Sequence, residues 1–339
     1  FMMETKLWKI TDDQKNNEQA IKEAAALLKK GETVAFPTET VYGLGADATN
    51  PDAVAKIFQA KGRPQDNPLI AHVATVEQLK KLVDNLPEYV EKLIAVFSPA
   101  PLTYVLPDNG VCAPNVTAGL STIAVRIPDH PVALALLEAC DCPLAAPSAN
   151  LSGKPSPTTA DHVYEDLAGK VAGIIDGGPT GVGVESTVIA CREQDVVILR
   201  PGGITKEQLE KIIPVGEPEK ESVDKPLSPG MKYKHYSPEI PLWLVAGDKE
   251  KIQTVIEEEQ AKGKKVALLA REQLLETVQA DIYLNLGSDL VHAANRLYDN
   301  LRKVKKSDAD LIIAEVFPKS GIGQALMNRL EKAMSKYIH

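Results

Sequence analysis

The chain has 339 residues, of which 44% are hydrophobic and 25% are charged, an ordinary composition for a globular protein. At one to two hundred residues per domain, this length predicts about two domains. The formal net charge of −8 argues against a protein that mainly coats nucleic acid, although it leaves room for a local basic pocket.

The cysteines and the start of the chain favour a cytoplasmic protein. None of the four cysteines forms a C-x-x-C pair, so we interpret them as free thiols in a reducing compartment rather than as zinc ligands. No apolar run approaches the roughly 20 residues of a membrane span. The first residues lack the basic and apolar regions of a signal peptide. We therefore expect the cytoplasm.

Short apolar strands and helices fill the first two hundred residues. Asn50 and Pro51 mark a helix start, and Gly31 marks a helix end. The hydrophobic periodicity predicts helices over 17–30, 51–60, 75–83, 87–96, 131–139 and 205–212. It predicts strands over 33–36, 69–74, 102–107, 121–127, 143–150, 171–176, 185–190 and 196–200.

A change of pattern follows residue 213. The segment 214–240 is rich in proline and charge and lacks a period, which is typical of a linker, yet its stretch SPGMKYKHYSP packs cations and aromatics together. Beyond it, strands predicted over 242–246, 265–270, 281–285 and 310–314 alternate with helices over 249–261, 271–277, 289–305 and 322–335. This alternation predicts a Rossmann-like parallel α/β domain. We expect a catalytic domain at 1–213, a linker or lid at 214–240 and a second domain at 241–339.

The first domain carries cations and hydroxyls where strands and loops meet. Such groups suit phosphate or carboxylate ligands, although each residue alone is also explained by surface exposure or turn formation. His72 stands among apolar neighbours, where a core histidine is the simpler interpretation. The cations are Lys61, Arg63, Arg126, Arg200, Lys232 and Lys234. The hydroxyl-rich turns are Thr38–Thr40, Ser148–Asn150 with Ser152 and Ser156, and Glu185–Thr187.

These residues predict a polar, partly cationic pocket for a small anionic molecule, but they specify no reaction. No H-E-x-x-H, G-x-S-x-G or paired carboxylate motif is present, so the sequence assigns no metal site and no catalytic residue. The second domain has neither a G-x-G-x-x-G turn nor a P-loop, and we assign it no nucleotide site.

Seven motifs in order give the chain a specific resemblance. They are PTETVYGLG, AKGRPQDNPL, PLTYVL, STIAVRIPDHP, APSANLSGKPSPT, ESTVI and LRPGGIT. Together they closely resemble the YrdC-like domain of the threonylcarbamoyl-adenylate synthases, and the linker and α/β tail resemble the two-domain form. The resemblance implies a twisted mixed sheet that encloses a large cavity.

The resemblance also implies an activity. Such enzymes are nucleotidyltransferases that make L-threonylcarbamoyl-AMP from L-threonine, bicarbonate and ATP and release pyrophosphate, with Mg²⁺ carried by the ATP phosphates. Other proteins then transfer the group to the adenosine next to the anticodon in tRNAs that read codons starting with A. A weak direct contact with tRNA is left open. A ribosome-associated or RNA-binding module that uses the same cationic cavity is the alternative.

Site residues follow from the matching motifs. For L-threonine the resemblance implies Thr40, His72, Arg126, the Ala146 backbone and Ser186. For ATP it implies Lys61, Arg63, Asn67, Thr122, Ser148, Ser156, Arg200 and, from the linker, Tyr236, with Tyr233 a weaker candidate. The chain departs from the family before PLT, where Ser98 and Ala100 replace the usual tryptophan and glycine. An alanine at 100 would be restrictive if the position needs a positive φ.

Overall fold

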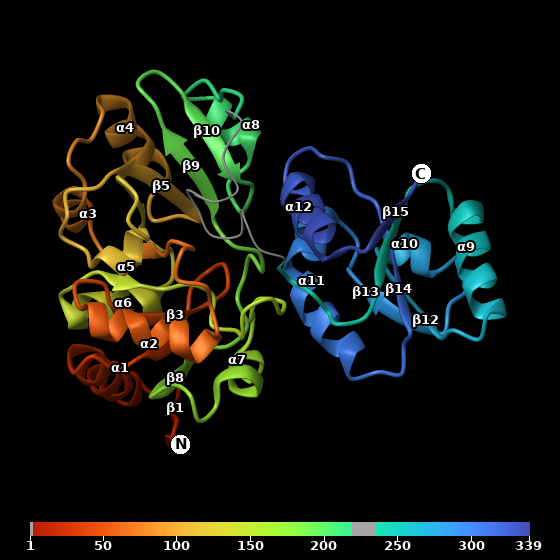
Figure 1. Ribbon diagram of the computed structural model, residues 1–339, viewed down its shortest axis with the longest axis horizontal. Helices are drawn as coiled ribbons and strands as arrows, with labels where there is room; N and C mark the ends of the chain where they lie inside the picture. The colour runs from red at the N-terminus through yellow and green to blue at the C-terminus, as the bar shows by residue number, and fades with distance from the viewer. Residues whose placement is uncertain (1–2, 219–234) are drawn as a thin grey trace. The chain divides into compact units, whose positions relative to one another are not determined.

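A computed structural model describes residues 3–218 and 235–339 (Figure 1). The described chain divides into two compact units. The first contains residues 3–152, Pro157–Gly181 and the part from Glu185 to residue 218, whereas the second contains Gly153–Ser156, Val182–Val184 and residues 235–339. Most of the predicted linker, including Lys232, Tyr233 and Lys234, lies outside the described residues.

One mixed sheet of ten strands forms the centre of the first unit, in the order β1-β8-β2-β3-β7-β4-β6-β5-β9-β10. The mixed sheet expected from the motif resemblance is confirmed. Its strands are β1 (Lys6–Lys9), β2 (Val34–Pro37), β3 (Tyr42–Asp47), β4 (Ile70–His72), β5 (Leu102–Pro107), β6 (Thr122–Arg126), β7 (Leu144–Ala145), β8 (Gly173–Asp176), β9 (Thr187–Cys191) and β10 (Val196–Arg200).

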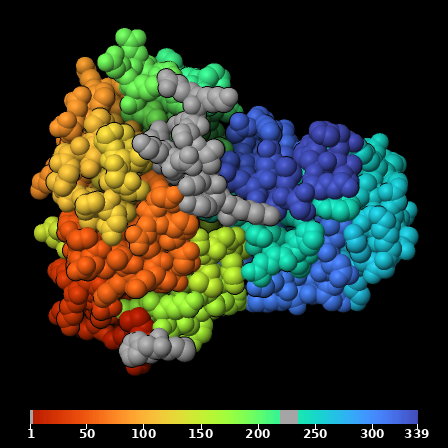
Figure 2. Space-filling model, viewed as in Figure 1, coloured from red at the N-terminus to blue at the C-terminus, as the bar shows by residue number. Residues whose placement is uncertain are grey.

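Eight helices accompany this sheet in the described part of the first unit. The space-filling view shows how segments far apart in the sequence, from orange to yellow-green, form one surface of this unit (Figure 2). The helices are α1 (Gln14–Lys29), α2 (Pro51–Lys61), α3 (Val76–Leu82), α4 (Glu88–Phe97), α5 (Pro114–Thr117), α6 (Pro131–Cys140), α7 (Ala160–Leu167) and α8 (Lys206–Glu210). As predicted, the Asn50 side chain caps α2 by accepting from two backbone N–H groups, and Gly31 follows α1 with a φ of 86°.

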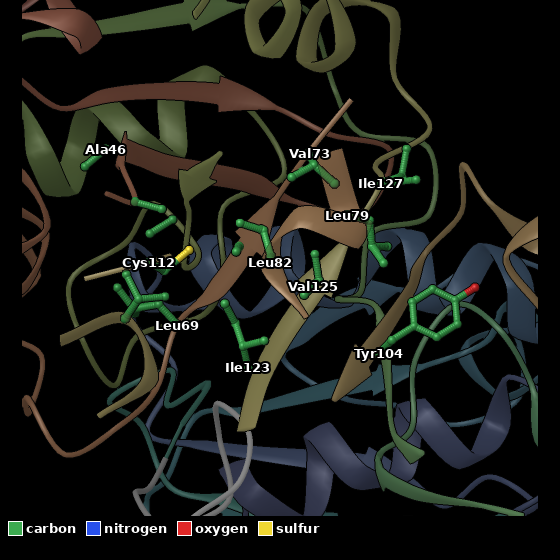
Figure 3. Close-up of a cluster of buried hydrophobic side chains, with 14 of the residues drawn as sticks. Ala46, Leu69, Val73, Leu79, Leu82, Tyr104, Cys112, Ile123, Val125 and Ile127 are labelled. Carbon is green, nitrogen blue, oxygen red and sulfur yellow. The ribbon is translucent and has the colours of Figure 1, made fainter. Parts of the chain in front are cut away.

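The two faces of the central strands have different surroundings. In β6, Ile123, Val125 and the following Ile127 enter the large core cluster, which also includes Leu69, Leu79, Leu82 and Tyr104 (Figure 3). The alternate residues Ala124 and Arg126 therefore face the other side of the sheet. There, Ala124 packs with Ile70, Val105 and Val188 in a small apolar cluster. In these central strands one face is thus core, and the other combines a small apolar cluster with polar side chains, whereas Phe36 of β2 and Ile175 of β8 belong to a second core cluster.

The second unit has a five-stranded sheet in which every pair is parallel, with the order β13-β12-β14-β11-β15. The predicted parallel α/β domain is confirmed, although counted within this unit its order is 3-2-4-1-5 and differs from the dinucleotide-binding order. The elements are β11 (Leu242–Val245), α9 (Lys249–Ala261), β12 (Val266–Ala270), α10 (Glu272–Leu275), β13 (Ile282–Asn285), α11 (Leu290–Lys305), β14 (Leu311–Glu315), α12 (Gly323–Ala333) and β15 (Lys336–Ile338).

Several elements were absent from the sequence prediction, or shorter than it. Strand β3 was missed because its glycines, Gly43 and Gly45, suggest a loop; the structure needs glycine there because a Cβ at Gly45 would lie 2.8 Å from the Phe36 ring. The edge strands β1 and β15 and the helices α5 and α7 were also missed. The strand predicted over 143–150 is only Leu144–Ala145, since Pro143 and Pro147 lie on either side and cannot donate to a ladder.

An added methyl group at Gly202, in the turn after β10, should destabilise the protein strongly. A Cβ at Gly202 would lie 2.4 Å from backbone atoms of Glu185, Ser186 and Thr187, which cannot move aside as a flexible side chain could. Gly202→Ala should therefore lower the free energy of unfolding by about 1–3 kcal/mol, measured by urea denaturation. Gly181→Ala, where a Cβ would meet nothing within 4 Å, is the matched control. Equal midpoints for the two variants would contradict this packing.

Candidate active site

A row of residues crosses five neighbouring strands of the first sheet. His72 on β4 pairs with Arg126 on β6, Arg126 pairs with Thr103 on β5, Thr103 pairs with Val188 on β9, and Val188 pairs with Arg200 on β10. Residues opposite one another in a ladder share a face of the sheet. Three of the predicted site residues, His72, Arg126 and Arg200, therefore lie in one row although 128 positions separate the first from the last.

Arg126 is buried and held on several sides. Its Nε donates to the Ala100 carbonyl at 3.2 Å, and Nη1 donates to Thr40 Oγ1 at 3.2 Å. Nη2 forms an ion pair with Glu39, whose second oxygen accepts from the Asp129 backbone N–H at 2.7 Å. Thr40 is fixed in turn by Thr38, whose hydroxyl lies 2.9 Å from its own. The turn between β2 and β3 thus orients the guanidinium.

These contacts do not use all the hydrogen-bond donors of Arg126. A guanidinium carries five N–H groups, and the hydrogen bonds that the described residues accept from Arg126 use three of them. One N–H then remains on each terminal nitrogen, and such a pair can bind a carboxylate bidentately. Burial lowers the pKa of Arg126 to about 9, and the positive charge of Arg200 contributes to that shift. The group is still charged at neutral pH, and a bound anion would relieve the repulsion.

Ser186 connects the row to its far end. Its hydroxyl lies 2.8 Å from Thr103 Oγ1, and Arg200 donates to its carbonyl at 2.9 Å and to its hydroxyl at 3.2 Å. Both Ser186 and Thr103 are buried. The predicted residues Thr40, His72, Arg126, Ser186 and Arg200 are therefore brought together in the first unit.

His72 is neutral at physiological pH. Its Nδ1 lies 3.1 Å from the Ile70 carbonyl, and its ring meets Phe36 edge-on at 6.4 Å. Complete burial lowers its pKa from 6.5 to about 4. The ring has the surroundings of a core histidine. Unlike a purely structural histidine, however, it lies beside Arg126 in the row.

A second group of predicted residues lies at the end of α2. Lys61 is buried, and its Nζ donates to the carbonyls of Ser148 at 2.5 Å and Asn150 at 2.7 Å. Arg63 donates to the Pro68 carbonyl at 2.8 Å. Asn67 is also buried, and its Oδ1 has no hydrogen-bond donor among the described residues. That orphaned acceptor is a feature that a ligand N–H group would satisfy.

The other predicted residues have different positions. Ala146 donates its N–H to the Ile70 carbonyl at 3.1 Å, so a ligand contact there would use its own carbonyl. Thr122 is half-buried at the opposite end of β6 from Arg126. Ser156 is buried in the second unit. Tyr236, also in that unit, has a φ of 64° and stacks on Tyr298 at 5.4 Å.

The sequence did not suggest a role in the site for Glu39, Thr103 or Ala100. Glu39 was visible only as one acid within the PTET turn, although a carboxylate amid so many cations is a signal of pairing. Ala100 was noted only as a departure from the family pattern; in the structure its φ is not positive, and its carbonyl holds Arg126. The expected backbone restriction at this position therefore does not arise.

Family models match both parts of the chain. Residues 26–202 match the Sua5/YciO/YrdC family model, described as telomere recombination, and residues 204–335 match the model of the threonylcarbamoyl-AMP synthase C-terminal domain. The chain belongs to the threonylcarbamoyl-AMP synthase family. The enzyme class, a nucleotidyltransferase, is the one predicted.

Individual relatives cover nearly the whole chain. Threonylcarbamoyl-AMP synthase of Bacillus subtilis is 52% identical over 98% of both chains, and that of Pyrococcus abyssi is 48% identical over 93% of this chain and 94% of its own. The crystal structure of P. abyssi Sua5 complexed with L-threonine superposes with a TM-score of 0.91 at 44% identity and covers 99% of this chain and all of its own. Escherichia coli YciO, at 22% identity and a TM-score of 0.53, shares the fold.

The described residues lack a metal cluster and a membrane-spanning helix. They contain no group of three or more His, Cys, Asp or Glu side chains that could hold a metal ion. Within residues 3–218 and 235–339, no helix has the length and apolar character needed to cross a membrane.

The depressed pKa of His72 predicts acid sensitivity. The unfolded chain, with a histidine pKa near 6.5, binds more protons below that pH than the folded chain, whose His72 pKa is about 4. Stability should therefore fall from pH 7.5 to pH 5, with His72 accounting for about 2 kcal/mol of the loss. Urea midpoints of His72→Gln should depend less on pH than those of the unchanged protein. The control is His292→Gln, at an exposed histidine; identical pH dependence in all three proteins would rule out the buried neutral ring.

Proposed function

We propose that this chain makes L-threonylcarbamoyl-AMP from L-threonine, bicarbonate and ATP, and that the row His72–Arg126–Thr103–Val188–Arg200 is its reaction centre. The observation that carries the proposal is Arg126, a buried guanidinium with one N–H left on each terminal nitrogen. The product serves the threonylcarbamoyl modification of the adenosine at position 37, next to the anticodon, in tRNAs that read codons starting with A.

The threonine subsite lies around Arg126. Arg126 takes the α-carboxylate of L-threonine through its two remaining donors. The hydroxyls of Thr40 and Ser186 and the carbonyl of Ala146 suit the ammonium and the side-chain hydroxyl of the amino acid. His72, neutral because its pKa is lowered to about 4, adds no positive charge that would repel the ammonium.

The nucleotide subsite uses the remaining predicted residues. Lys61, Arg63 and Arg200 face the phosphates, and Asn67, Ser148, Thr122 and Ser156 supply polar contacts. Tyr236 of the linker contacts the nucleotide as part of a lid. The apolar cluster of Ile70, Val105, Ala124 and Val188 lies on the same face of the sheet as Arg126 and provides an apolar surface beside the reacting groups. Mg²⁺ arrives with the ATP phosphates.

The reaction divides into two steps. The threonine ammonium first releases a proton to water; the free amine nitrogen then attacks the bicarbonate carbon and water leaves, which gives N-carboxy-threonine. An oxygen of its carboxylate then attacks the α-phosphorus of ATP, and pyrophosphate leaves. The site residues supply hydrogen-bond donors and positive charge, and none of them is assigned as a general base. Positioning and charge stabilisation therefore supply the rate enhancement.

The cellular setting follows from this product. Other proteins accept the adenylate and transfer its threonylcarbamoyl group to tRNA, and direct contact of this chain with tRNA would be weak at most. We place the enzyme in the cytoplasm, where its tRNA substrates are. The RNA-binding alternative is not favoured by the comparisons, since the full-length relatives are named as synthases.

Pyrophosphate release is the direct test. The purified chain with Mg-ATP should release pyrophosphate only when L-threonine and bicarbonate are both present, and omission of either should abolish it. Release that continues without L-threonine would overturn the proposal. So would ATP binding without release under any combination of substrates.

Replacing Arg126 should affect binding at the threonine subsite and not at the nucleotide subsite. In Arg126→Ala the KM for L-threonine should rise at least about tenfold, because a charged hydrogen-bonded pair is lost, whereas the KM for ATP should change little. Arg192→Ala, at a partly exposed arginine that pairs with Asp195, is the control and should leave both constants unchanged. A rise of equal size in both constants would argue against the carboxylate-binding role.

Removing the charge of Glu39 should affect the KM for L-threonine less than replacing Arg126 does. If Glu39 holds Arg126 in place, Glu39→Gln should raise the KM for L-threonine about threefold or more and leave kcat nearly unchanged, because the buried ion pair is lost but the shape is kept. Glu91→Gln, in an exposed ion pair with Lys80, is the control. A lower KM in Glu39→Gln would instead identify Glu39 as a competitor for the substrate's place.

A further inference from the structure

The order of the strands creates a crevice in the second unit. Helices α9 and α10 pack in one apolar cluster against strand residues such as Val266 and Ile313, whereas α11 and α12 contact each other. Figure 1 shows α9 and α11 on opposite sides of the sheet. The neighbouring strands β12 and β14 therefore send their following helices, α10 and α12, to opposite faces. Ligands of open α/β sheets bind at such a switch point, outside the carboxyl ends of the strands.

A pocket of about 560 Å³ lies at this edge. It is lined by residues that follow or end the three central strands: Lys249 after β11, Arg271 after β12 and Glu315 at the end of β14. Gln273, Leu274 and Thr277 of the α10 region line it as well. The pocket thus coincides with the switch point that the topology defines.

Arg271 is fixed within this pocket by one acid and one ring. Its Nε and Nη2 donate to the two oxygens of Glu315 at 3.3 and 2.8 Å, and its backbone N–H donates to the same carboxylate at 3.0 Å. The guanidinium lies 5.2 Å from the centre of the Phe317 ring. The hydrogen bond to Glu315 raises the pKa of Arg271. Within the described chain, Nη1 donates to no acceptor, so one edge of the guanidinium stays available.

Lys249 adds a second cation. Among the residues that the structure describes, it forms no ion pair and is exposed at the first turn of α9. The two cations Lys249 and Arg271 and the single acid Glu315 leave this pocket with a net positive charge, in a chain whose net charge is −8. A preoriented guanidinium edge beside an ammonium group is the donor set that proteins use for carboxylates and phosphates.

We propose that the second unit binds a small oxyanion, the carboxylate or phosphate group of a metabolite, between Arg271 and Lys249. Glu315 and Phe317 orient Arg271 for this contact. The ligand is not a dinucleotide, because the loop after β11 has a single glycine and lacks a glycine-rich phosphate turn. This site is independent of the reaction assigned to the first unit.

The full chain labelled with ¹⁵N provides a local readout. The Nε–H signal of Arg271, assigned by its loss in Arg271→Lys, reports on the guanidinium itself, so anions that bind in the first unit do not interfere. Titration with inorganic phosphate in one arm and citrate in the other, at constant ionic strength, should shift this signal with saturation. A response to phosphate alone identifies a phosphate ester as the ligand class, and a response to citrate alone identifies a carboxylate.

Lys249→Ala tests whether the second cation takes part. The Kd from the same signal should rise at least about fivefold when the ammonium is removed. Lys319→Ala, at a lysine of the same unit that pairs with Glu331, is the matched control and should leave the Kd unchanged. A signal that neither anion moves, or an equal Kd in Lys249→Ala and the unchanged protein, would overturn the proposal.

Discussion

The burial of one guanidinium determines how several segments of the first unit fit together. A charge removed from water is costly unless hydrogen bonds replace its solvent, and Arg126 obtains them from two separate segments: the Ala100 carbonyl before β5, and the Thr40 hydroxyl and Glu39 carboxylate of the turn between β2 and β3. The acid also receives the Asp129 backbone N–H, so the turn after β2 is tied to the loop after β6. These segments must be in place before Arg126 can be buried, and the same bonds determine which of its donors remain.

The mixed sheet explains how the distant residues meet. A parallel pairing brings His72 beside Arg126, and an antiparallel pairing brings Thr103 beside it from the other side. Since side chains alternate between faces, the row and the small apolar cluster share one face while Ile123 and Val125 anchor the other in the core. A shift of one residue in β6 would exchange Arg126 with a core residue, and hence the core fixes the register of the site.

The sequence could predict much of this, and its failures have physical reasons. Local signals placed the helix after Asn50 and the alternation of strands and helices in the second unit, because caps and periodicity act within a few residues. Strand β3 was missed since its glycines serve close packing against Phe36, a contact that only the folded sheet reveals. The row itself rests on pairings between distant strands, which no local pattern encodes. Residue types made Arg126 and Ser186 candidates, the resemblance alone gave them a role with L-threonine, and the part played by Glu39 needed coordinates.

Ala100 shows why a departure from a family motif need not disturb a site. Its contribution is its backbone: the carbonyl accepts from Arg126 at 3.2 Å, and the N–H donates to Ile127 at 3.0 Å. Both bonds depend on the path of the chain rather than on the side chain, and its φ is one that any residue can adopt. The added methyl group is buried beside the core that Ile127 also joins. A site oriented by backbone carbonyls therefore tolerates sequence change where one oriented by side chains would not.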